Sequence, residues 1–297
     1  MQIYAGSTHP DLAQKLSKLS GFPVGKIEIS QFPNHEIRIH ILEDKIDREA
    51  IVIQSIVTHP NKAIMEFSLI MDALRRSGAR EITAVIPWLG YCIQDKVFRK
   101  GEPLSARVVA DLISASHPDK IITFDLHNET IQGFFNHQIY HLSAVPLLLE
   151  EIKKHSMPDI IVAPDVGALK ESTKIAHSLD LPIAVLNKKR DLKTGKVEII
   201  GIDRQIEGQH ALIMDDFIST GSTLIQTVKY LKDHGVKHIS VGVTHHLFVE
   251  NTHQKLLQSG INDLYISNSV TLPKNLETAN DFHLHQIDIS PEINKYL

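Results

Sequence analysis

The sequence predicts an α/β protein made of two doubly wound domains with mainly parallel sheets. Short apolar runs rich in β-branched residues alternate with helical patterns along the chain. Most of these runs lack polar alternation, which is typical of strands buried on both faces of a parallel sheet. With 297 residues, of which 42% are hydrophobic, the chain is more natural as two domains than as one.

Seven apolar runs are the clearest strand candidates, at residues 51–53, 82–86, 121–124, 160–162, 183–186, 211–214 and 239–243. Helical spacings lie between them. Leu12, Leu16 and Leu19 end before Gly21, and the stripe within residues 224–231 runs to Gly235. Glycine just past the last apolar position is a common helix stop. Repeated units of this kind predict a doubly wound fold with ligands at the carboxyl ends of the strands.

No low-complexity linker divides the chain. The best boundary lies near residues 140–145, where a new cycle of helix and strand begins. We therefore expect an N-terminal domain at residues 1–143 and a C-terminal domain at residues 144–297. The last residues of the chain could return to pack on the first domain.

The bulk composition excludes several classes of function. The net charge is −4, so no basic face for nucleic acid is expected. Cys92 is the only cysteine, which fits a reducing compartment. The start MQIYAG reads as a strand with no signal-peptide pattern, and no apolar run approaches the ~18 residues of a membrane span. We expect a soluble, cytoplasmic protein.

The stretch LIMDDFISTGSTLIQTV, residues 212–228, carries the strongest chemical signal. Asp215 and Asp216 follow an apolar run and would project from the carboxyl edge of a sheet, where they could accept hydrogen bonds from sugar hydroxyls. The next five residues form a hydroxyl-rich turn that leads into a helix: Ser219, Thr220, Gly221, Ser222 and Thr223. Glycine allows a close backbone approach, and main-chain N–H groups at a helix start favour an anion.

This pattern indicates a phosphorylated sugar with vicinal hydroxyls. On this stretch alone, a simpler alternative stays open, in which Ser219 or Thr220 merely caps a helix and the aspartates are a solvated strand end. The histidines raise a second question. His137 and His141 lack the adjacent glutamate of a zinc-protease helix, and the chain has no cysteine pair, so we expect no zinc site.

Several segments in one order resemble ribose-phosphate pyrophosphokinase, the enzyme family that makes 5-phosphoribosyl 1-diphosphate. They are AVIPWLGYCIQDKVFRKGEPLSARVVADLI, FDLHNETIQGFF, IVAPDVGALK, LNKKRDLKTGKVE and the DDFISTGST stretch itself. The similarity covers nearly the whole chain. FRKGEPLSA and DDFISTGSTL resemble the shorter, archaeal-type members of the family.

The resemblance implies two phosphoribosyltransferase-like domains and transfer of the β,γ-diphosphoryl group of MgATP to the 1-hydroxyl of ribose 5-phosphate. It also implies a homo-oligomer whose active site lies between the domains and is shared with a partner subunit. In the C-terminal half it implies Lys188 as a catalytic residue and Arg190 as catalytic and substrate-binding. Residues 219–223 would bind the 5-phosphate, with Asp165, Asp215 and Asp216 on the ribose.

In the N-terminal half, the resemblance implies an ATP site that includes Gln94 and Asp95. Phe32, Asn34 and Glu36 of FPNHE match its adenine-binding stretch, with Phe32 supplied by a neighbouring subunit. A further set, His127, Asp125 and Asp165, would serve the Mg²⁺ ion.

The chain departs from the family pattern in several places. Ile93 stands where family members usually carry an arginine, which removes a cation near ATP, and Lys96 or Arg99 could substitute for it. Asn136 and Tyr140 replace common aspartates of a second cation site. The loop VFRKGEPLS differs from the regulatory loop of the longer enzymes.

Two other functions remain as alternatives. The first is a non-catalytic regulatory homologue, which Ile93 and Asn136 favour and the intact Lys188, Arg190 and DDFISTGST oppose. The second is a phosphoribosyltransferase that consumes 5-phosphoribosyl 1-diphosphate. Those enzymes usually have one catalytic domain and a hood, whereas this chain has a whole preceding nucleotide-like half.

Overall fold

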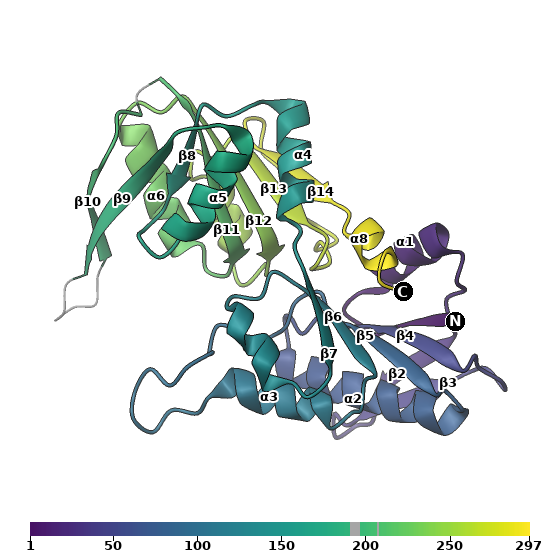
Figure 1. The fold of residues 1–297 in the computed structure, drawn as a ribbon. Coiled ribbons are helices and arrows are strands. Elements are labelled where there is room, and N and C mark those ends of the chain that lie inside the picture. The colour runs from purple at the N-terminus through teal and green to yellow at the C-terminus, as the bar shows by residue number, and fades with distance from the viewer. Residues whose placement is uncertain (191–196, 207) are drawn as a thin grey trace. The chain divides into compact units, whose positions relative to one another are not determined.

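The computed structural model describes residues 1–190, 197–206 and 208–297, and it describes only the main chain of residues 189, 190, 197 and 198. The chain forms two compact units (Figure 1). Unit 1 consists of residues 1–144, 268–271 and 288–297, and unit 2 consists of residues 145–267 and 272–287. Each unit has its own sheet and core.

The sheet of unit 1 is fully parallel, with the strand order β1-β4-β5-β6-β7. Its strands are β1 (Gln2–Ala5), β4 (Glu49–Ile53), β5 (Glu81–Val85), β6 (Lys120–Phe124) and β7 (Gln138–Leu142). The last four residues of β4, β5 and β6 are almost wholly buried, as the unalternated apolar runs predict. Because the strands are parallel, all their carboxyl ends lie along one edge.

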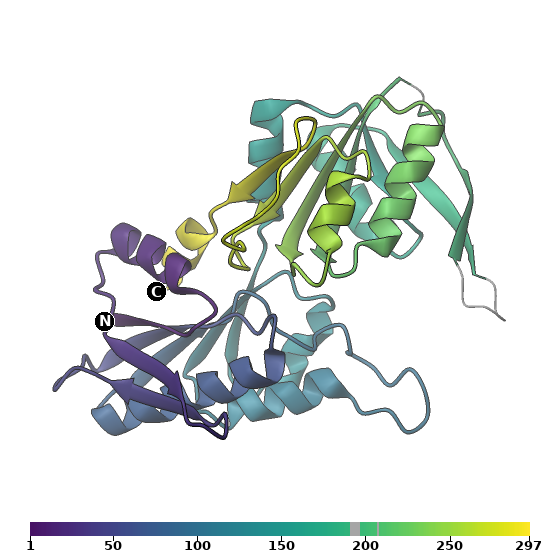
Figure 2. The same cartoon turned by 180° about the vertical axis from the view of Figure 1, so that it is seen from behind.

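Helices cover both faces of this sheet (Figures 1 and 2). They are α1 (Pro10–Ser20), α2 (Pro60–Ser77), α3 (Ser105–Ser114), η1 (Glu129–Phe134) and α8 (Ser290–Asn294), and a hairpin of β2 (Ile27–Gln31) and β3 (Ile37–Ile41) packs against α2. Proline occupies the first turn of α1 and α2, where no N–H is needed. Gly21 ends α1 in the left-handed conformation at φ 77°, which confirms the predicted stop.

Two short C-terminal segments belong to unit 1. Ser55 at the end of β4 donates its hydroxyl to the Ser269 carbonyl at 2.6 Å. Thr271 donates to the Thr8 carbonyl at 2.7 Å, and its hydroxyl also lies 3.3 Å from Nδ1 of the buried His9. These contacts tie residues 268–271 to the carboxyl edge of the unit 1 sheet.

Unit 2 has a larger sheet with the strand order β10-β9-β8-β11-β12-β13-β14 (Figure 1). Its strands are β8 (Ile160–Ala163), β9 (Ile183–Arg190), β10 (Val197–Ile202), β11 (His210–Ile218), β12 (His238–His246), β13 (Asp263–Ser267) and β14 (His283–Ile287). Only β10 runs antiparallel to its neighbour. The expected α/β fold with mainly parallel sheets is therefore confirmed.

Two apolar layers enclose the unit 2 sheet. On one face, α4 (Val145–His155) and α5 (Leu169–Leu179) pack on Ile161, Leu212 and Met214. On the other, α6 (Ser222–Asp233) and α7 (Thr252–Leu257) pack on alternate strand residues that include Val162 and Ile213. The predicted stripe of α6 is core, with Leu224, Val228 and Leu231 at most 7% exposed.

One predicted boundary is wrong, because β11 does not end at Met214. The strand continues to Ile218 and pairs with β12 through that residue, so Asp215 and Asp216 lie within a strand. On its other side, β11 pairs with β8 only at Ala211 and Leu212. The aspartates are therefore at the carboxyl edge because β8 has ended, although their own strand has not.

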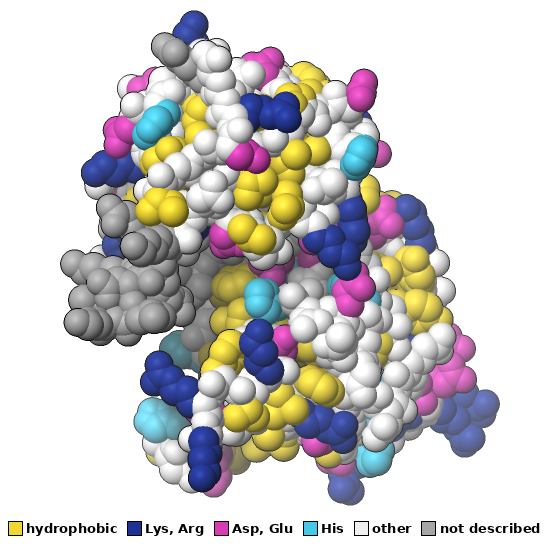
Figure 3. All heavy atoms as spheres, turned by 60° about the vertical axis from the view of Figure 1, so that its left-hand side comes forward, with side chains coloured by type: hydrophobic (Ala, Val, Ile, Leu, Met, Phe, Trp, Pro, Cys, Tyr) yellow, Lys and Arg dark blue, Asp and Glu magenta, His cyan; other side chains and the backbone are white. Residues whose placement is uncertain are grey.

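The surface carries no dominant charge on the face drawn in Figure 3, where acidic and basic side chains are interspersed with hydrophobic ones. Within the described ranges, no helix is long and apolar enough to cross a membrane.

The burial of His9 makes the stability of unit 1 depend on pH. Burial lowers the pKa of His9 to about 4, so the folded protein keeps it neutral while the unfolded chain protonates it near pH 6.5. Its contribution is present above pH 6.5 and is lost as the pH falls toward 4, by up to ~3 kcal/mol. We expect His9→Gln to weaken this acid destabilisation.

The measurement is denaturant unfolding at several pH values, followed by the fluorescence of Trp88, the single tryptophan, which is buried in unit 1. His40 is exposed, so His40→Gln is the matched control, and its free energy of unfolding should keep the wild-type pH dependence. Equal slopes for His9→Gln and the wild type between pH 6.5 and 4 would contradict the account.

Candidate active site

The carboxyl edge of the unit 2 sheet brings three predicted residues together. Asp165 follows β8, Lys188 lies near the end of β9, and Asp215 lies in the part of β11 that extends past β8. Lys188 Nζ is 3.9 Å from Asp165 Oδ2. This arrangement follows from parallel pairing, because β8 lies between β9 and β11.

Lys188 has a largely buried side chain. Its side chain is 11% exposed. Burial lowers the pKa of the ammonium below its usual range, although Asp165 and Asp215 act in the opposite direction. A cation in such a site is poorly hydrated, so it interacts more strongly with an incoming phosphate than a surface lysine would.

A tight turn fixes Asp165. Its Oδ1 accepts a hydrogen bond from the Ala168 N–H at 3.0 Å, while Oδ2 faces Lys188. Gly167 favours this turn, because a Cβ atom there would crowd the same Oδ1 at 3.1 Å. One oxygen of Asp165 is thus held by the main chain, and the other faces the site.

Asp215 and Asp216 form an adjacent acidic pair. Each accepts a hydrogen bond at 3.0 Å from the main-chain N–H of the next residue. Asp215 has solvent-exposed surface, but protein atoms surround its carboxyl. This enclosure, followed by the hydrogen bond and the charge of Asp216, raises the pKa of Asp215 well above its usual range. A protonated Asp215 can donate as well as accept a hydrogen bond.

The predicted phosphate turn follows β11 directly. Gly221 is the residue before α6 and has φ 69°, a conformation that favours glycine. No side chain caps this helix start, and its first turn contains no acidic residue. The simpler alternative, in which Ser219 or Thr220 caps α6, is therefore not observed. The main-chain N–H groups at the start of α6 remain suited to an anion.

Thr252, which the sequence analysis missed, supports this turn. Its hydroxyl donates to the Ser219 carbonyl at 2.8 Å, and its methyl would be 3.2 Å from a Cβ atom at Gly221. On the open side, Thr220 and Ser222 place their hydroxyl oxygens 3.2 Å apart. No local signal links Thr252 to a turn some thirty residues earlier in the chain.

Arg190 ends β9, but its side chain lies outside the described residues. Its assigned role therefore rests on the resemblance alone.

Two predicted nucleotide residues of unit 1, Gln94 and Asp95, lie in the loop after β5. Asp95 accepts a hydrogen bond from the Asn128 amide at 2.7 Å, which links this loop to the segment after β6. Gln94 accepts from the Ser105 hydroxyl at 2.7 Å and is thereby tied to the start of α3. Asn128 follows the DLH motif directly, and this position is the signal by which it could have been found.

The two metal candidates of unit 1 differ in exposure. Asp125 Oδ2 accepts a hydrogen bond from the Ala144 N–H at 2.8 Å, so this carboxylate helps to fix the end of unit 1. His127 is exposed at the same edge. No group of three or more His, Cys, Asp or Glu residues in the described part of the chain could hold a metal ion by itself.

The adenine candidates lie in the turn of the β2–β3 hairpin. The Phe32 N–H donates to the Glu36 carbonyl at 2.9 Å, and the Glu36 N–H lies 3.3 Å from Asn34 Oδ1. These bonds close a compact turn, which leaves Phe32 48% exposed. An aromatic ring in this position can stack on a base outside its own unit.

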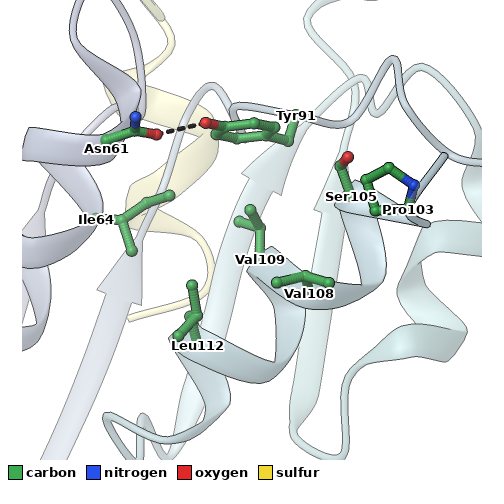
Figure 4. A pocket seen from close by; sticks show the side chains of 8 residues that line it. All are labelled: Asn61, Ile64, Tyr91, Pro103, Ser105, Val108, Val109 and Leu112. Carbon is green, nitrogen blue, oxygen red and sulfur yellow. Dashed lines mark hydrogen bonds between the residues drawn. The ribbon is translucent and has the colours of Figure 1, made fainter.

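A separate cavity of about 190 Å³ lies beside the loop between β5 and α3, and between the helices α2 and α3 (Figure 4). Its walls are mostly apolar and include Ile64, Val109 and Leu112, and the Tyr91 hydroxyl donates to the Asn61 amide oxygen at its rim. It has no charged lining residue, so it does not suit a phosphate.

Comparison with known proteins agrees with both halves of this description. Residues 1–116 match the N-terminal domain of ribose phosphate pyrophosphokinase, and residues 137–262 match the phosphoribosyl transferase domain. Ribose-phosphate pyrophosphokinase of Burkholderia pseudomallei is 33% identical over 92% of this chain and 86% of that protein. The enzyme of that name from Bacillus caldolyticus is 34% identical over 92% and 87%, respectively.

The fold of the whole chain also has a solved counterpart. The crystal structure of phosphoribosylpyrophosphate synthetase from Mycobacterium smegmatis matches with a TM-score of 0.90 at 31% identity. The match covers 99% of this chain and 96% of that one.

The turn before α6 gives a test of the phosphate site. Alanine at position 221 would require the left-handed conformation and would crowd Thr252, so it should displace the N–H groups that face the anion. We expect Gly221→Ala to raise the Kd for ribose 5-phosphate by about 10-fold or more, measured by isothermal titration calorimetry.

Gly260→Ala is the matched control, because Gly260 has φ 95° in the same unit and the nearest atoms to its Cβ would belong to the flexible side chain of Lys232. The two substitutions impose similar backbone strain, so only the first should change binding. An unchanged Kd for Gly221→Ala would remove this turn from the binding site.

Proposed function

The chain belongs to the ribose-phosphate pyrophosphokinase family and is an enzyme of that activity, and we propose how its residues transfer the diphosphoryl group of ATP to the 1-hydroxyl of ribose 5-phosphate. Our assignment of roles rests on one observation: Lys188, Asp165 and Asp215 form a group beside the turn before α6. It offers a cation, sugar-binding carboxyl groups and an anion site on one sheet edge.

The acceptor sugar is held from two sides. Residues 219–223 bind its 5-phosphate through main-chain N–H groups and hydroxyls at the start of α6. Asp215 and Asp216 bind the ribose hydroxyls, and Asp165 orients the sugar so that its 1-hydroxyl can attack the β-phosphorus. The raised pKa of Asp215 supports this assignment, because a carboxyl group that is less readily ionised repels the 5-phosphate less.

Lys188 stabilises the transfer itself. Charge builds on the bridging and terminal phosphate oxygens during phosphoryl transfer, and a fixed, poorly hydrated cation stabilises that charge. Arg190 contributes a second cation and contacts the substrate, as the family pattern implies. Gln94 and Asp95, together with Phe32, Asn34 and Glu36, bind ATP.

Mg²⁺ fits this set of residues as an ion held mainly by substrate phosphates. Mg²⁺ commonly binds through one or two carboxylates and phosphate oxygens, and Asp165 Oδ2 offers a carboxylate oxygen that the main chain does not hold. We assign Asp165, His127 and Asp125 as its protein contacts, and the Asp125 carboxylate also accepts the Ala144 N–H. When bound, the ion would neutralise the phosphates of ATP.

The finer assignments follow from the same family membership. We infer a cytoplasmic homo-oligomer in which Phe32 serves the site of a neighbouring subunit, and its exposure supports that role. FRKGEPLSA supports an assignment to the shorter, archaeal-type members. The match of residues 1–116 to the N-terminal domain opposes a phosphoribosyltransferase, whereas Ile93 keeps the non-catalytic homologue as the second candidate.

The deciding experiment is ³¹P NMR of the purified protein with MgATP and ribose 5-phosphate, and then with each substrate omitted. We expect the diphosphate resonances of 5-phosphoribosyl 1-diphosphate and an equal amount of AMP, only when both substrates are present. Folded protein that makes no AMP under any divalent metal or phosphate condition would favour the non-catalytic homologue.

The role of Lys188 gives a second test by mutation. Lys188→Ala should lower kcat by about 10²–10³-fold with a much smaller change in the KM for ribose 5-phosphate, because the lost charge acts mainly in the transition state. Lys170→Ala, at an exposed position of α5, should retain wild-type kinetics. A loss confined to KM would make Lys188 a ground-state binding residue.

A further inference from the structure

The loop between β5 and α3 contains Ile93, where family members usually carry an arginine. Three basic residues follow in the same loop, Lys96, Arg99 and Lys100. The loop projects from the helical layer of unit 1 (Figures 1 and 2). Ile93 is partly buried, so its side chain helps to pack the base of the loop. The cation expected at this position must therefore come from elsewhere if the phosphates of ATP are to be balanced.

Two of the three cations line a common pocket. It has a volume of about 570 Å³ and is lined by Gln94, Lys96, Phe98, Arg99, Glu102 and Pro103. Gln94 also belongs to the proposed ATP site, so the pocket shares this residue with it. Lys100 is exposed on the same loop but does not line the pocket.

A turn within the loop leaves the Arg99 guanidinium available. Glu102 Oε2 accepts a hydrogen bond from the Arg99 main-chain N–H at 2.9 Å, and the Glu102 N–H donates to the Arg99 carbonyl at 3.1 Å. Gly101 permits this turn with φ 97°. The carboxylate of Glu102 thus binds the main chain of Arg99, and within the described ranges no carboxylate pairs with the guanidinium.

Lys96 is held at the pocket by an aromatic contact. Its Nζ lies 5.1 Å from the centre of the Phe98 ring, a cation–π geometry. Such a contact restrains the ammonium without neutralising its charge. Phe98 is 61% exposed, so part of its ring surface can also contact a base.

We propose that Arg99 and Lys96 together supply the positive charge that Ile93 lacks and bind the phosphates of ATP. This inference rests on the proposed function and deepens its nucleotide site. Two cations and an exposed aromatic ring beside Gln94 suit a nucleoside triphosphate better than a sugar phosphate. The pocket thus contributes to the choice of ATP and has no part in binding ribose 5-phosphate.

The test compares Arg99→Ala, Lys96→Ala and the double variant in steady-state kinetics and in equilibrium binding of ATP. Each single variant should raise both the KM and the Kd for ATP by about 10-fold, and the double variant should raise them further. The KM for ribose 5-phosphate should stay within about twofold. Lys100→Ala should leave every constant unchanged.

A rescue variant separates the charge from the loop structure. Ile93→Arg in the Arg99→Ala background restores a cation by another route, so it should recover most of the lost ATP affinity. Circular dichroism and Trp88 fluorescence establish that each variant is folded. Failure of the rescue in a folded variant would show that Arg99 acts through the structure of the loop and not through its charge. That result would overturn the proposal that Arg99 supplies the charge that Ile93 lacks.

The outcomes also distinguish this inference from the proposed function. An active enzyme whose double variant binds ATP as tightly as the wild type would overturn the inference and leave the function intact. A wild-type protein that makes no AMP would overturn the function, and ATP binding by the wild type and the Arg99→Ala variant would still decide the role of the pocket.

Discussion

The site of unit 2 depends on a difference in length between two adjacent strands. β8 ends at Ala163, while β11 continues to Ile218 along β12. The space that β8 leaves is where Asp165, Lys188 and Asp215 can face one another, and where the carboxyl of Asp215 is enclosed but still open to a ligand. If β8 paired with β11 for its full length, main-chain atoms would fill that space.

The difference in strand length also explains how Lys188, the aspartates and the turn before α6 can lie at one edge of the sheet. Asp215 and Asp216 lie within β11, so they cannot move away from each other, and the enclosure of the Asp215 carboxyl, followed by the proximity of Asp216, raises the pKa of Asp215. The turn before α6 comes three residues later and is oriented by Thr252 through the Ser219 carbonyl. The groups proposed to bind the sugar and the phosphate are thus positioned by one strand and one turn.

Much of this could be predicted from local sequence, and the rest depends on distant contacts. The β-branched runs identify the buried strands because strands covered on both faces need no polar alternation. The end of β11 could not be predicted, since two aspartates have low strand propensity and only pairing with β12 keeps them extended. Glycine, hydroxyls and an apolar stripe identified the turn before α6, but nothing local indicated Thr252 or the bond between Asn128 and Asp95.

The two sheet edges also show why a similar motif need not perform the same task. FDLH in unit 1 and MDDF in unit 2 both place an acidic residue at the carboxyl edge of a parallel sheet. In unit 1, Asp125 accepts the Ala144 N–H, and the buried Glu66 accepts the Ser7 N–H at 2.6 Å and the Gln54 amide at 2.9 Å.

These acidic groups of unit 1 therefore hold the ends of its own strands and turns. Asp215 and Asp216 in unit 2 accept hydrogen bonds from the main chain next to them, Asp215 also bonds the Asp216 side chain, and both stay at an edge that β8 does not cover. A carboxylate that closes its own fold has little capacity left for a ligand, whereas one at an uncovered strand edge keeps that capacity. The difference supports the proposal that the sugar hydroxyls bind to unit 2, and that unit 1 recognises the nucleotide through amides, an exposed aromatic hairpin turn and the cations of its long loop.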